Sequence, residues 1–188
     1  GATAQQVQLT STAGPITLGA DIGNATDELT LIATAGNIVG GAGTATANNL
    51  TLTAAGGIGI GTVVNSNTTG TLALTTSGAT AAGNITLVEA NAFNTSRVTL
   101  VTAATAQTDQ LNPTAGPITL GADIGNATDD LTLIATAGHI VGGAGTAAAN
   151  TLTVTAAGGI GLGTGGRANT TGKPALAAQR ATRRGDSP

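Results

Sequence analysis

The sequence predicts an all-β protein whose short strands wind into a parallel solenoid of about seven coils. Two observations carry this prediction, a long stretch that occurs twice and a shorter unit that recurs inside it. Residues 116–164 repeat residues 14–62 without a gap, and only six of 49 aligned positions differ. A repeat that is too small to bury its own apolar residues must stack on its neighbours, so a layered architecture follows.

The composition favours a thin, regular core. Charged residues make up 8% of the 188 residues, against roughly 25% in a typical globular domain, and Phe93 is the only aromatic residue. The absence of cysteine excludes cysteine-based zinc and redox sites. No apolar run approaches the ~18 residues that span a membrane, and the N-terminal residues do not resemble a signal peptide, so we expect a piece of a longer protein.

From the N-terminus, the first strand is expected at Val7–Thr10, and a shorter unit then recurs. Each unit opens after an Ala-Gly pair, runs through a short strand containing isoleucine, passes a polar turn and closes with a second strand. The Ala-Gly pairs end at Gly14, Gly36, Gly56, Gly83, Gly116, Gly138 and Gly158. Their spacings of 22, 20, 27, 33, 22 and 20 residues make the long repeat four short ones.

Both strands of a unit alternate apolar and polar residues, which places the apolar side chains on one face. The opening strands are expected at 16–18, 38–39, 58–60, 85–87, 118–120, 140–141 and 160–162. The closing strands are expected at 29–31, 50–52, 72–74, 98–100, 131–133 and 152–154.

Strands this short need stacking for stability, and parallel coils ~4.8 Å apart provide it. We expect one interior ladder from the closing strands, made of Leu29, Leu50, Leu72, Val98, Leu131 and Leu152, with their partners Leu31, Leu52, Leu74, Leu100, Leu133 and Val154. Glycine pairs such as Gly40-Gly41 and Gly142-Gly143 are expected at corners with positive φ. Loops are expected at 63–70 and about 102–114, including Pro113, and Phe93 in or beside an excursion at 89–96.

An antiparallel sandwich of short strands is the alternative fold. It normally shows Asn-Gly or Asp-Gly hairpin turns, and neither dipeptide occurs here. A sandwich also needs a bulkier core than this composition supplies, so the solenoid is preferred.

The repeated AG-x-I and L-T-L units, as in Leu50–Ile58, resemble the haemagglutinin-type repeats of large bacterial exoproteins, namely filamentous haemagglutinin-like adhesins and autotransporter passenger domains. The resemblance covers about residues 7–164. It implies a right-handed parallel β-helix, export across a Gram-negative envelope to the medium or the cell surface, and an adhesive or scaffold role. Host-cell or matrix glycans or proteins are then the expected partners.

The charge divides the chain into two parts. Residues 1–164, the expected solenoid domain, carry a net charge of −7, whereas residues 165–188 carry +4 and break the repeat. We expect a basic, disordered tail there. Its charge and the sequence Arg184-Gly185-Asp186 suggest nucleic-acid, membrane or integrin binding, but the tail lacks stacking aromatics and a tripeptide is too short to identify a ligand, so no nucleic-acid partner is expected.

No set of residues indicates catalysis, and we expect neither an enzyme nor a cofactor. Asp21, Asp27 and Glu28 recur as Asp123, Asp129 and Asp130, which makes a calcium site conceivable, although the calcium-binding nonapeptide is absent and turn capping is the simpler interpretation. A polysaccharide-degrading site needs paired carboxylates in a cleft with aromatic and basic groups that the repeat lacks. His139 has no cysteine or second histidine to act with and is expected to be a turn residue.

The outward positions of the closing strands form one candidate binding face. Stacked coils would align them in two uncharged columns roughly 7 Å apart, with rows ~4.8 Å apart. The columns contain Thr30, Ile32, Thr51, Thr53, Thr75, Thr99, Val101, Thr132, Ile134, Thr153 and Thr155, with Ala73. The preferred function is a stiff stalk or scaffold, and the alternatives are an ice- or glycan-binding face or a polysaccharide-degrading β-helix. Uncapped ends also favour end-to-end self-association.

Overall fold

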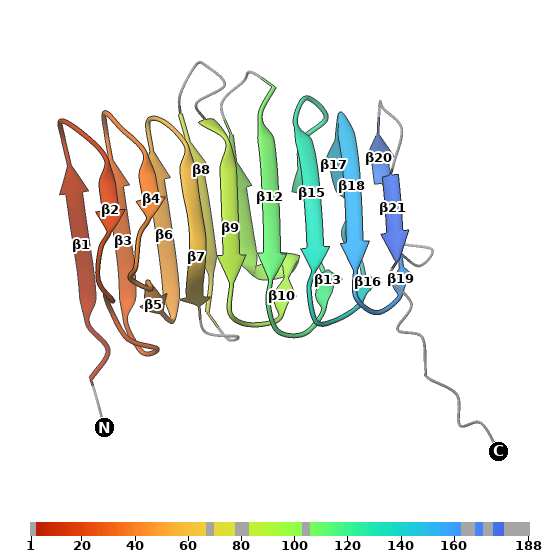
Figure 1. The fold of residues 1–188 in the computed structure, drawn as a ribbon, viewed down its shortest axis with the longest axis horizontal. Helices are drawn as coiled ribbons and strands as arrows, with labels where there is room; N and C mark the ends of the chain where they lie inside the picture. The colour runs from red at the N-terminus through yellow and green to blue at the C-terminus, as the bar shows by residue number, and fades with distance from the viewer. Residues whose placement is uncertain are drawn as a thin grey trace.

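The computed structural model describes residues 3–66, 70–77, 83–102, 106–162, 168–170 and 175–178. Within this part of the chain nearly every regular element is a β-strand, and all the strand pairings are parallel. Figure 1 shows the strands following one another along the long axis, from β1 at one end to β21 at the other. The prediction of an all-β parallel solenoid is confirmed, and it has about six turns.

Four parallel sheets form the sides of the solenoid. The long sheet contains, in spatial order, β2 (Ile16–Leu18), β4 (Ile38–Gly40), β7 (Ile58–Ser66), β9 (Ile85–Glu89), β12 (Thr108–Pro113), β15 (Asp130–Ala135), β18 (Thr151–Ala156) and β21 (Ala175–Ala178). The five-stranded sheet contains β1 (Gln6–Ser11), β3 (Glu28–Ala33), β6 (Asn49–Ala54), β8 (Leu72–Thr76) and β11 (Val98–Val101).

The other two sheets are shorter. The four-stranded sheet contains β10 (Phe93–Asn94), β13 (Ile118–Leu120), β16 (Ile140–Gly142) and β19 (Ile160–Gly161). The three-stranded sheet contains β14 (Ile124–Gly125), β17 (Ala147–Ala149) and β20 (Ala168–Thr170). The strand β5 (Thr46–Ala47) pairs with the end of β7, and a short 3-10 helix, η2 (Thr95–Arg97), precedes β11. Because β14 lies beside β11, the three-stranded sheet continues the side that the five-stranded sheet begins.

The core consists of ladders of identical or similar apolar residues in register. In the long sheet Ile16, Ile38, Ile58 and Ile85 are consecutive partners, and the last three are fully buried. The five-stranded sheet carries a second ladder through Leu29, Leu50 and Leu72, as the alternating pattern predicts. Leucine, isoleucine and alanine fill the narrow interior, so little aromatic volume is needed.

Corresponding strands of the two copies lie on different sides of the solenoid. The closing strands β3 and β6 lie in the five-stranded sheet, whereas their counterparts β15 and β18 lie in the long sheet. The opening strands β2 and β4 lie in the long sheet, and their counterparts β13 and β16 lie in the four-stranded sheet. The single interior ladder expected from the sequence is therefore wrong. Leu131 and Leu152 extend the ladder of the long sheet, while Leu29, Leu50, Leu72 and Val98 belong to the five-stranded sheet.

The strand β12 causes this change of side. The expectation of a loop at about 102–114 is wrong for residues 108–113, which pair with β9 on one edge and with β15 on the other. Asp109 and Leu111 are fully buried, and Pro113 ends the strand. An offset of 102 residues aligns β12 with β1, so β12 opens the second copy as β1 opens the first.

Two other expected loops also differ from the structure. Val63–Ser66 belong to β7, so the expected loop at 63–70 is wrong over these residues, and 67–69 lie outside the described residues. Phe93 lies in β10 with 4% of its surface exposed and has Ile118 as its partner in the next turn. The single aromatic residue is thus part of the core.

Space, and not positive φ, explains the glycines after the Ile-Val strands. Within the described residues, positive φ occurs at Gly23, Gly116 and Gly125, so the expectation for the pairs at 40–41 and 142–143 is wrong. A Cβ atom at Gly43 would lie 2.1 Å from the carbonyl oxygen of Ala20 in the preceding turn. The neighbouring turn passes too close for any side chain there.

Near the C-terminus two strands lie inside the range for which the sequence analysis expects a disordered tail. Residues 168–170 form β20, which pairs with β17, and residues 175–178 form β21, which pairs with β18. The expectation is not met in these two segments. The rest of 165–188, including Arg184-Gly185-Asp186, lies outside the described residues, so the boundary at 164 stays a prediction.

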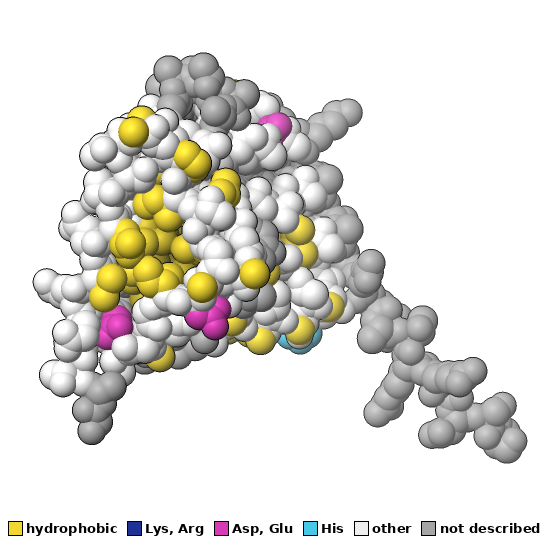
Figure 2. Space-filling view, turned by 60° about the vertical axis from the view of Figure 1, so that its left-hand side comes forward, with side chains coloured by type: hydrophobic (Ala, Val, Ile, Leu, Met, Phe, Trp, Pro, Cys, Tyr) yellow, Lys and Arg dark blue, Asp and Glu magenta, His cyan; other side chains and the backbone are white. Residues whose placement is uncertain are grey.

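The N-terminal end of the solenoid leaves part of the core layer open. Leu9 is 42% exposed, and Val7, Ile16 and Ile22 are only partly buried although they pack against the core. Figure 2, which brings this end forward, shows hydrophobic side chains gathered there.

Among the described residues there is no helix with the length and apolar character that crossing a membrane requires.

Candidate functional site

The lateral threonine face, defined as the eleven outward residues predicted as a binding face together with Ala73, is divided between two sides. On the five-stranded sheet one column runs through Thr30, Thr51, Ala73 and Thr99, and the other through Ile32, Thr53, Thr75 and Val101. These side chains alternate with buried or partly buried neighbours, and all are partly exposed except Thr99 and Val101, which are exposed. The predicted two-column arrangement is present on this side.

The remaining members lie on the long sheet. Thr132 pairs with Thr153, and Ile134 with Thr155, on β15 and β18. In the preceding turn the same columns continue through Gln110 and Asn112, the partners of Thr132 and Val88, so the rows change from threonine to amide side chains. The predicted continuous ribbon is therefore wrong, because the extra strand β12 turns the second copy to the next side.

Each half of the face presents hydroxyl and methyl groups without charge. The hydroxyl groups of Thr30, Thr51 and Thr53 make no hydrogen bond within the described part of the chain, so they face solvent or a ligand. Such a surface can pack against a flat, uncharged partner or donate single hydrogen bonds. Its members carry no carboxyl, imidazole or amino group.

The repeated turn carboxylates bind backbone N–H groups of neighbouring turns. Asp21 accepts a hydrogen bond from the Thr44 backbone N–H at 2.8 Å. Asp27 accepts one from the Gln5 N–H at 3.0 Å and one from the Asn24 side chain at 2.6 Å. The two carboxylates thus connect turns on opposite sides of their own, which favours the capping role over a shared calcium site.

Their counterparts Asp123 and Asp129 in the second copy accept the corresponding backbone N–H groups. Asp123 accepts from the hydroxyl and the backbone N–H of Thr146, each at 2.8 Å, and these two hydrogen bonds lower the pKa of Asp123 below its usual value. Asp130 and Glu28 accept amide hydrogen bonds from Asn150 and Gln6. No three His, Asp or Glu residues gather into a metal-binding group in the described part of the chain.

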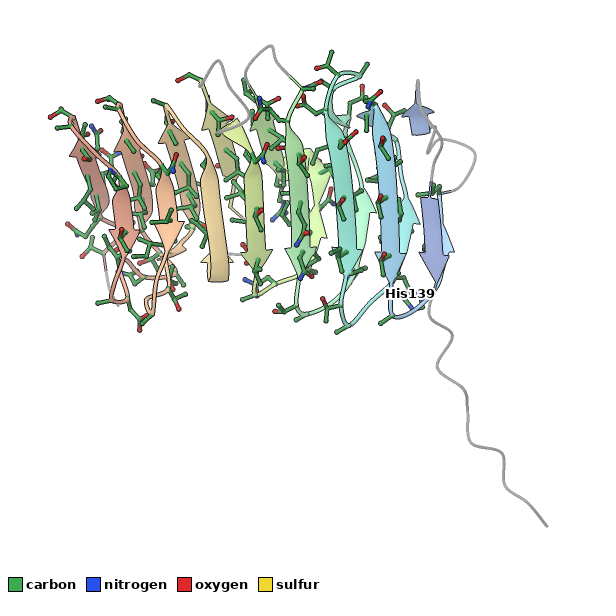
Figure 3. The ribbon with its side chains drawn as sticks, turned by 45° about the horizontal axis from the view of Figure 1, so that its top comes forward. His139 is labelled. Carbon is green, nitrogen blue, oxygen red and sulfur yellow. The ribbon has the colours of Figure 1, made fainter. Side chains whose placement is uncertain are left out.

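His139 is an inter-turn hydrogen-bond acceptor. Its Nδ1 accepts from the Gly159 backbone N–H at 2.7 Å, and its counterpart Asn37 accepts from Gly57 at 2.9 Å through its amide oxygen. This bond fixes the neutral tautomer that carries hydrogen on Nε2. Figure 3 labels His139 at the turn, where it is exposed beside a shallow hollow lined by Val141 and glycine backbone.

One polar cluster was missed by the sequence analysis. Asp109 and Asp129 are both buried where the second copy begins, with 0% and 1% of their surfaces exposed. Burial, followed by the charge of Asp129, raises the pKa of Asp109 to about 7. The sequence signal for this cluster is the 102-residue offset. It aligns Asp109 with Val7, which predicts an interior position for Asp109.

Comparisons of the chain with protein-family models, with curated proteins and with solved structures find no match. The class of protein is therefore defined by the structure alone. It is a parallel β-solenoid in which residues 116–164 repeat residues 14–62, whose lateral threonine face is uncharged and whose polar turn residues bind neighbouring turns.

Proposed function

We propose that this chain is a structural repeat region of a secreted or surface-exposed bacterial adhesin-like protein, where it serves as a stiff stalk or scaffold. The observation that carries the proposal is the long sheet, which runs without interruption from β2 through both copies to β21. Every turn is joined to the next by parallel strand pairing and by a continuous core. Bending such a rod would break several ladders at once.

The polar residues support a structural role. Several turn side chains accept a hydrogen bond from a backbone N–H of another turn, and these bonds hold the turns in register. The residues are Asp21, Asp27, Asn37 and His139. These hydrogen bonds lie at exposed or part-buried turns, so each contributes about 0.5–1.5 kcal/mol to the stacking. The proposal assigns no catalytic step and no cofactor to the chain.

Small-angle X-ray scattering on tandem chains tests the stiffness. One long repeat spans four turns and one side, so each added copy of residues 6–107 should lengthen a rigid rod by about 20 Å. Chains with one, two and three copies are compared at constant cross-section. A maximum dimension that does not grow linearly would contradict a stiff stalk. Surface exposure is tested separately, with antibodies against this chain on intact cells and culture medium of the source organism, and a signal confined to lysed cells would contradict export.

The lateral threonine face supports a second candidate, binding of ice or of a neutral glycan. Its support is the register of Thr30 with Thr51, and of Ile32 with Thr53, which spaces rows at about 4.8 Å. Thermal hysteresis and glycan-array binding are measured with the wild-type chain and with Thr51→Lys, which places a charge in the centre of the face. A stalk gives no signal in either assay, whereas a binding face gives a signal that the variant loses.

End-to-end self-association of the separate chain is a further part of the proposal. The open N-terminal layer around Leu9 supports it, and so do the outer edges of β1 and β2, which pair with no strand in the described part of the chain, because such edges accept further strands. Sedimentation velocity over a concentration series should show reversible growth above micromolar concentration, reduced in Leu9→Lys. A monodisperse monomer throughout would contradict it.

A further inference from the structure

Asp109 occupies a position that the rest of its ladder fills with apolar side chains. Its partners in the neighbouring turns of the long sheet are Ile85 and Leu131, which are 0% and 1% exposed. Asp109 itself has no exposed surface. A carboxylate in such a place is stable only if it is neutralised or fully hydrogen-bonded.

The hydrogen bonds of Asp109 are incomplete. Its Oδ1 accepts from the Ile85 backbone N–H at 3.2 Å, while its Oδ2 has no hydrogen-bond partner among the described residues. Buried polar atoms without a partner are rare in folded proteins and demand an explanation. A proton on Oδ2 turns this acceptor into a donor, which then needs an acceptor nearby.

Asp129 supplies that acceptor. Its Oδ1 accepts the backbone N–H of Gln107, two residues before Asp109, which brings the Asp129 carboxyl group beside Asp109. Four donors already bind the carboxyl oxygens of Asp129. They are the Gln107 backbone N–H at 3.0 Å, the Asn126 amide at 2.6 Å, the Thr102 hydroxyl and, more distantly, the Thr128 hydroxyl at 3.3 Å. Two adjacent buried carboxyl groups cannot both ionise cheaply, so the poorly solvated Asp109 is the one that holds a proton.

We propose that Asp109 and Asp129 share one proton in the folded protein and so form a pH-sensitive joint between the first two turns of the second copy, where β12 pairs with β15. The proton resides on Oδ2 of Asp109 and is donated to the carboxylate of Asp129. When the proton leaves to solvent, two negative charges face each other across the pairing of β12 with β15. The joint therefore loosens as the pH rises and tightens as it falls.

The direction follows from the pKa of Asp109. Burial and the Asp129 charge raise this pKa from 3.8 to about 7 in the folded protein. A raised carboxyl pKa leaves stability intact below 3.8, erodes it as the pH rises from there towards 7, and gives the full loss above 7.

No other charge replaces Asp129 in this role. Glu89, on the adjacent strand β9, lies at the opposite end of the strand, where its partner is Pro113. Asp130, next to Asp129 on β15, takes a hydrogen bond from Asn150 on the outer surface. Arg97, the basic residue of the described part of the chain, is exposed on η2.

The first copy contains a natural control. Asp27 is the counterpart of Asp129 and accepts the same backbone hydrogen bond, from Gln5 in place of Gln107. The counterpart of Asp109 is Val7, which cannot ionise. Asp109→Val therefore gives the second copy the chemistry of the first, and Asp109→Asn keeps a donor of similar size in a form that cannot ionise.

Thermal unfolding of the 188-residue chain between pH 4.5 and pH 8.5 tests the joint. The wild-type Tm should fall by on the order of 10 °C across this range relative to Asp109→Asn, whose profile should lack this component. Hydrogen exchange, corrected for the intrinsic pH dependence, should show loosening at residues 106–113 and 130–135 at high pH, and not at 28–54. Infrared spectra at pH 6 should contain a protonated carboxyl band that Asp109→Asn removes.

Two results would overturn the proposal. One is a parallel pH profile for wild type and Asp109→Asn together with no protonated carboxyl band at pH 6. The other is a rise in the wild-type Tm on adding Ca²⁺ at pH 8, reversed by a chelator and absent from Asp109→Asn, which would show that a cation and not a proton joins the two carboxyl groups. If Asp109→Val fails to fold, the asparagine variant and the infrared band still decide the matter.

Discussion

The stacked core is tested most directly by substitutions at Leu52. This residue has no exposed surface, and its partners in the turns on either side, Leu31 and Leu74, are also fully buried. Leu52→Ala removes methyl groups from a rigid ladder whose other members are fixed by strand pairing, so the cavity cannot collapse. We expect a loss of about 3 kcal/mol in the free energy of unfolding, within the range of buried leucine truncations.

Three companion variants separate the contributions. The second copy has Val154 at this position, so Leu52→Val should cost only about 1 kcal/mol. Leu52→Asp should unfold the neighbouring turns, because it buries an unpaired charge. Thr51→Ala, one residue away on the outer surface, should change stability by less than about 0.5 kcal/mol. Urea unfolding followed by circular dichroism measures all four, and equal midpoints for Leu52→Ala and Thr51→Ala would refute the interior assignment.

Three further predictions follow from the contacts between turns. Gly43→Ala should lower the Tm strongly, since its Cβ would meet backbone 2.1 Å away, whereas Gly59→Ala, with open space around it, should not; equal effects would contradict the steric argument. His139→Asn should preserve the Tm, and His139→Leu should cost about 1 kcal/mol through the lost acceptor, measured by urea unfolding. Deleting residues 165–188 should lower the Tm because β21 covers the edge of β18, in contrast to the expectation from composition, and an unchanged Tm would support the disordered tail.

Local alternation was enough to predict most strands and the direction of their side chains. The residues Leu29, Leu31, Leu50 and Leu52 point inward, and Thr30 and its neighbours point outward, as an apolar-polar alternation requires. The stacking of turns followed from the repeat. These features depend on residues that are close together in the sequence, so they can be predicted from it.

The side of the solenoid that each strand occupies depends on everything before it. Between Gly83 and Gly116 the spacing is 33 residues, and the sequence analysis assigned the extra length to a loop. The structure places four strands there, β9, β10, β11 and β12, one more than a turn of three sides needs. The last of these strands was not predicted, because residues 108–113 lack the apolar-polar alternation. The interior position that alternation would fill with an apolar residue is occupied by Asp109.

The same reasoning explains why local alternation alone did not reveal the buried pair at Asp109 and Asp129. Asp129 repeats Asp27 and is recognisable as a turn residue, but its neighbour in the preceding turn is set by the register of β12. Without that register, Asp109 is one carboxylate in a polar stretch. The pair exists only because the strand that opens the second copy lies between β9 and β15.

The extra side also limits what the lateral threonine face can bind. A flat partner that lies along Thr30 and Thr51 on the five-stranded sheet cannot reach Thr132 and Thr153, which lie on the next side. The threonine rows on the five-stranded sheet therefore end with the first copy. A second patch of threonine rows begins on the neighbouring side of the solenoid. A protein binds an ice crystal more tightly when its threonine rows form one unbroken flat array. A rod is stiff when its ladders are continuous, and the sides on which its threonine residues lie do not affect this. The change of side interrupts the array and leaves the ladder of the long sheet continuous in strand pairing, so it favours the stalk over the ice-binding face.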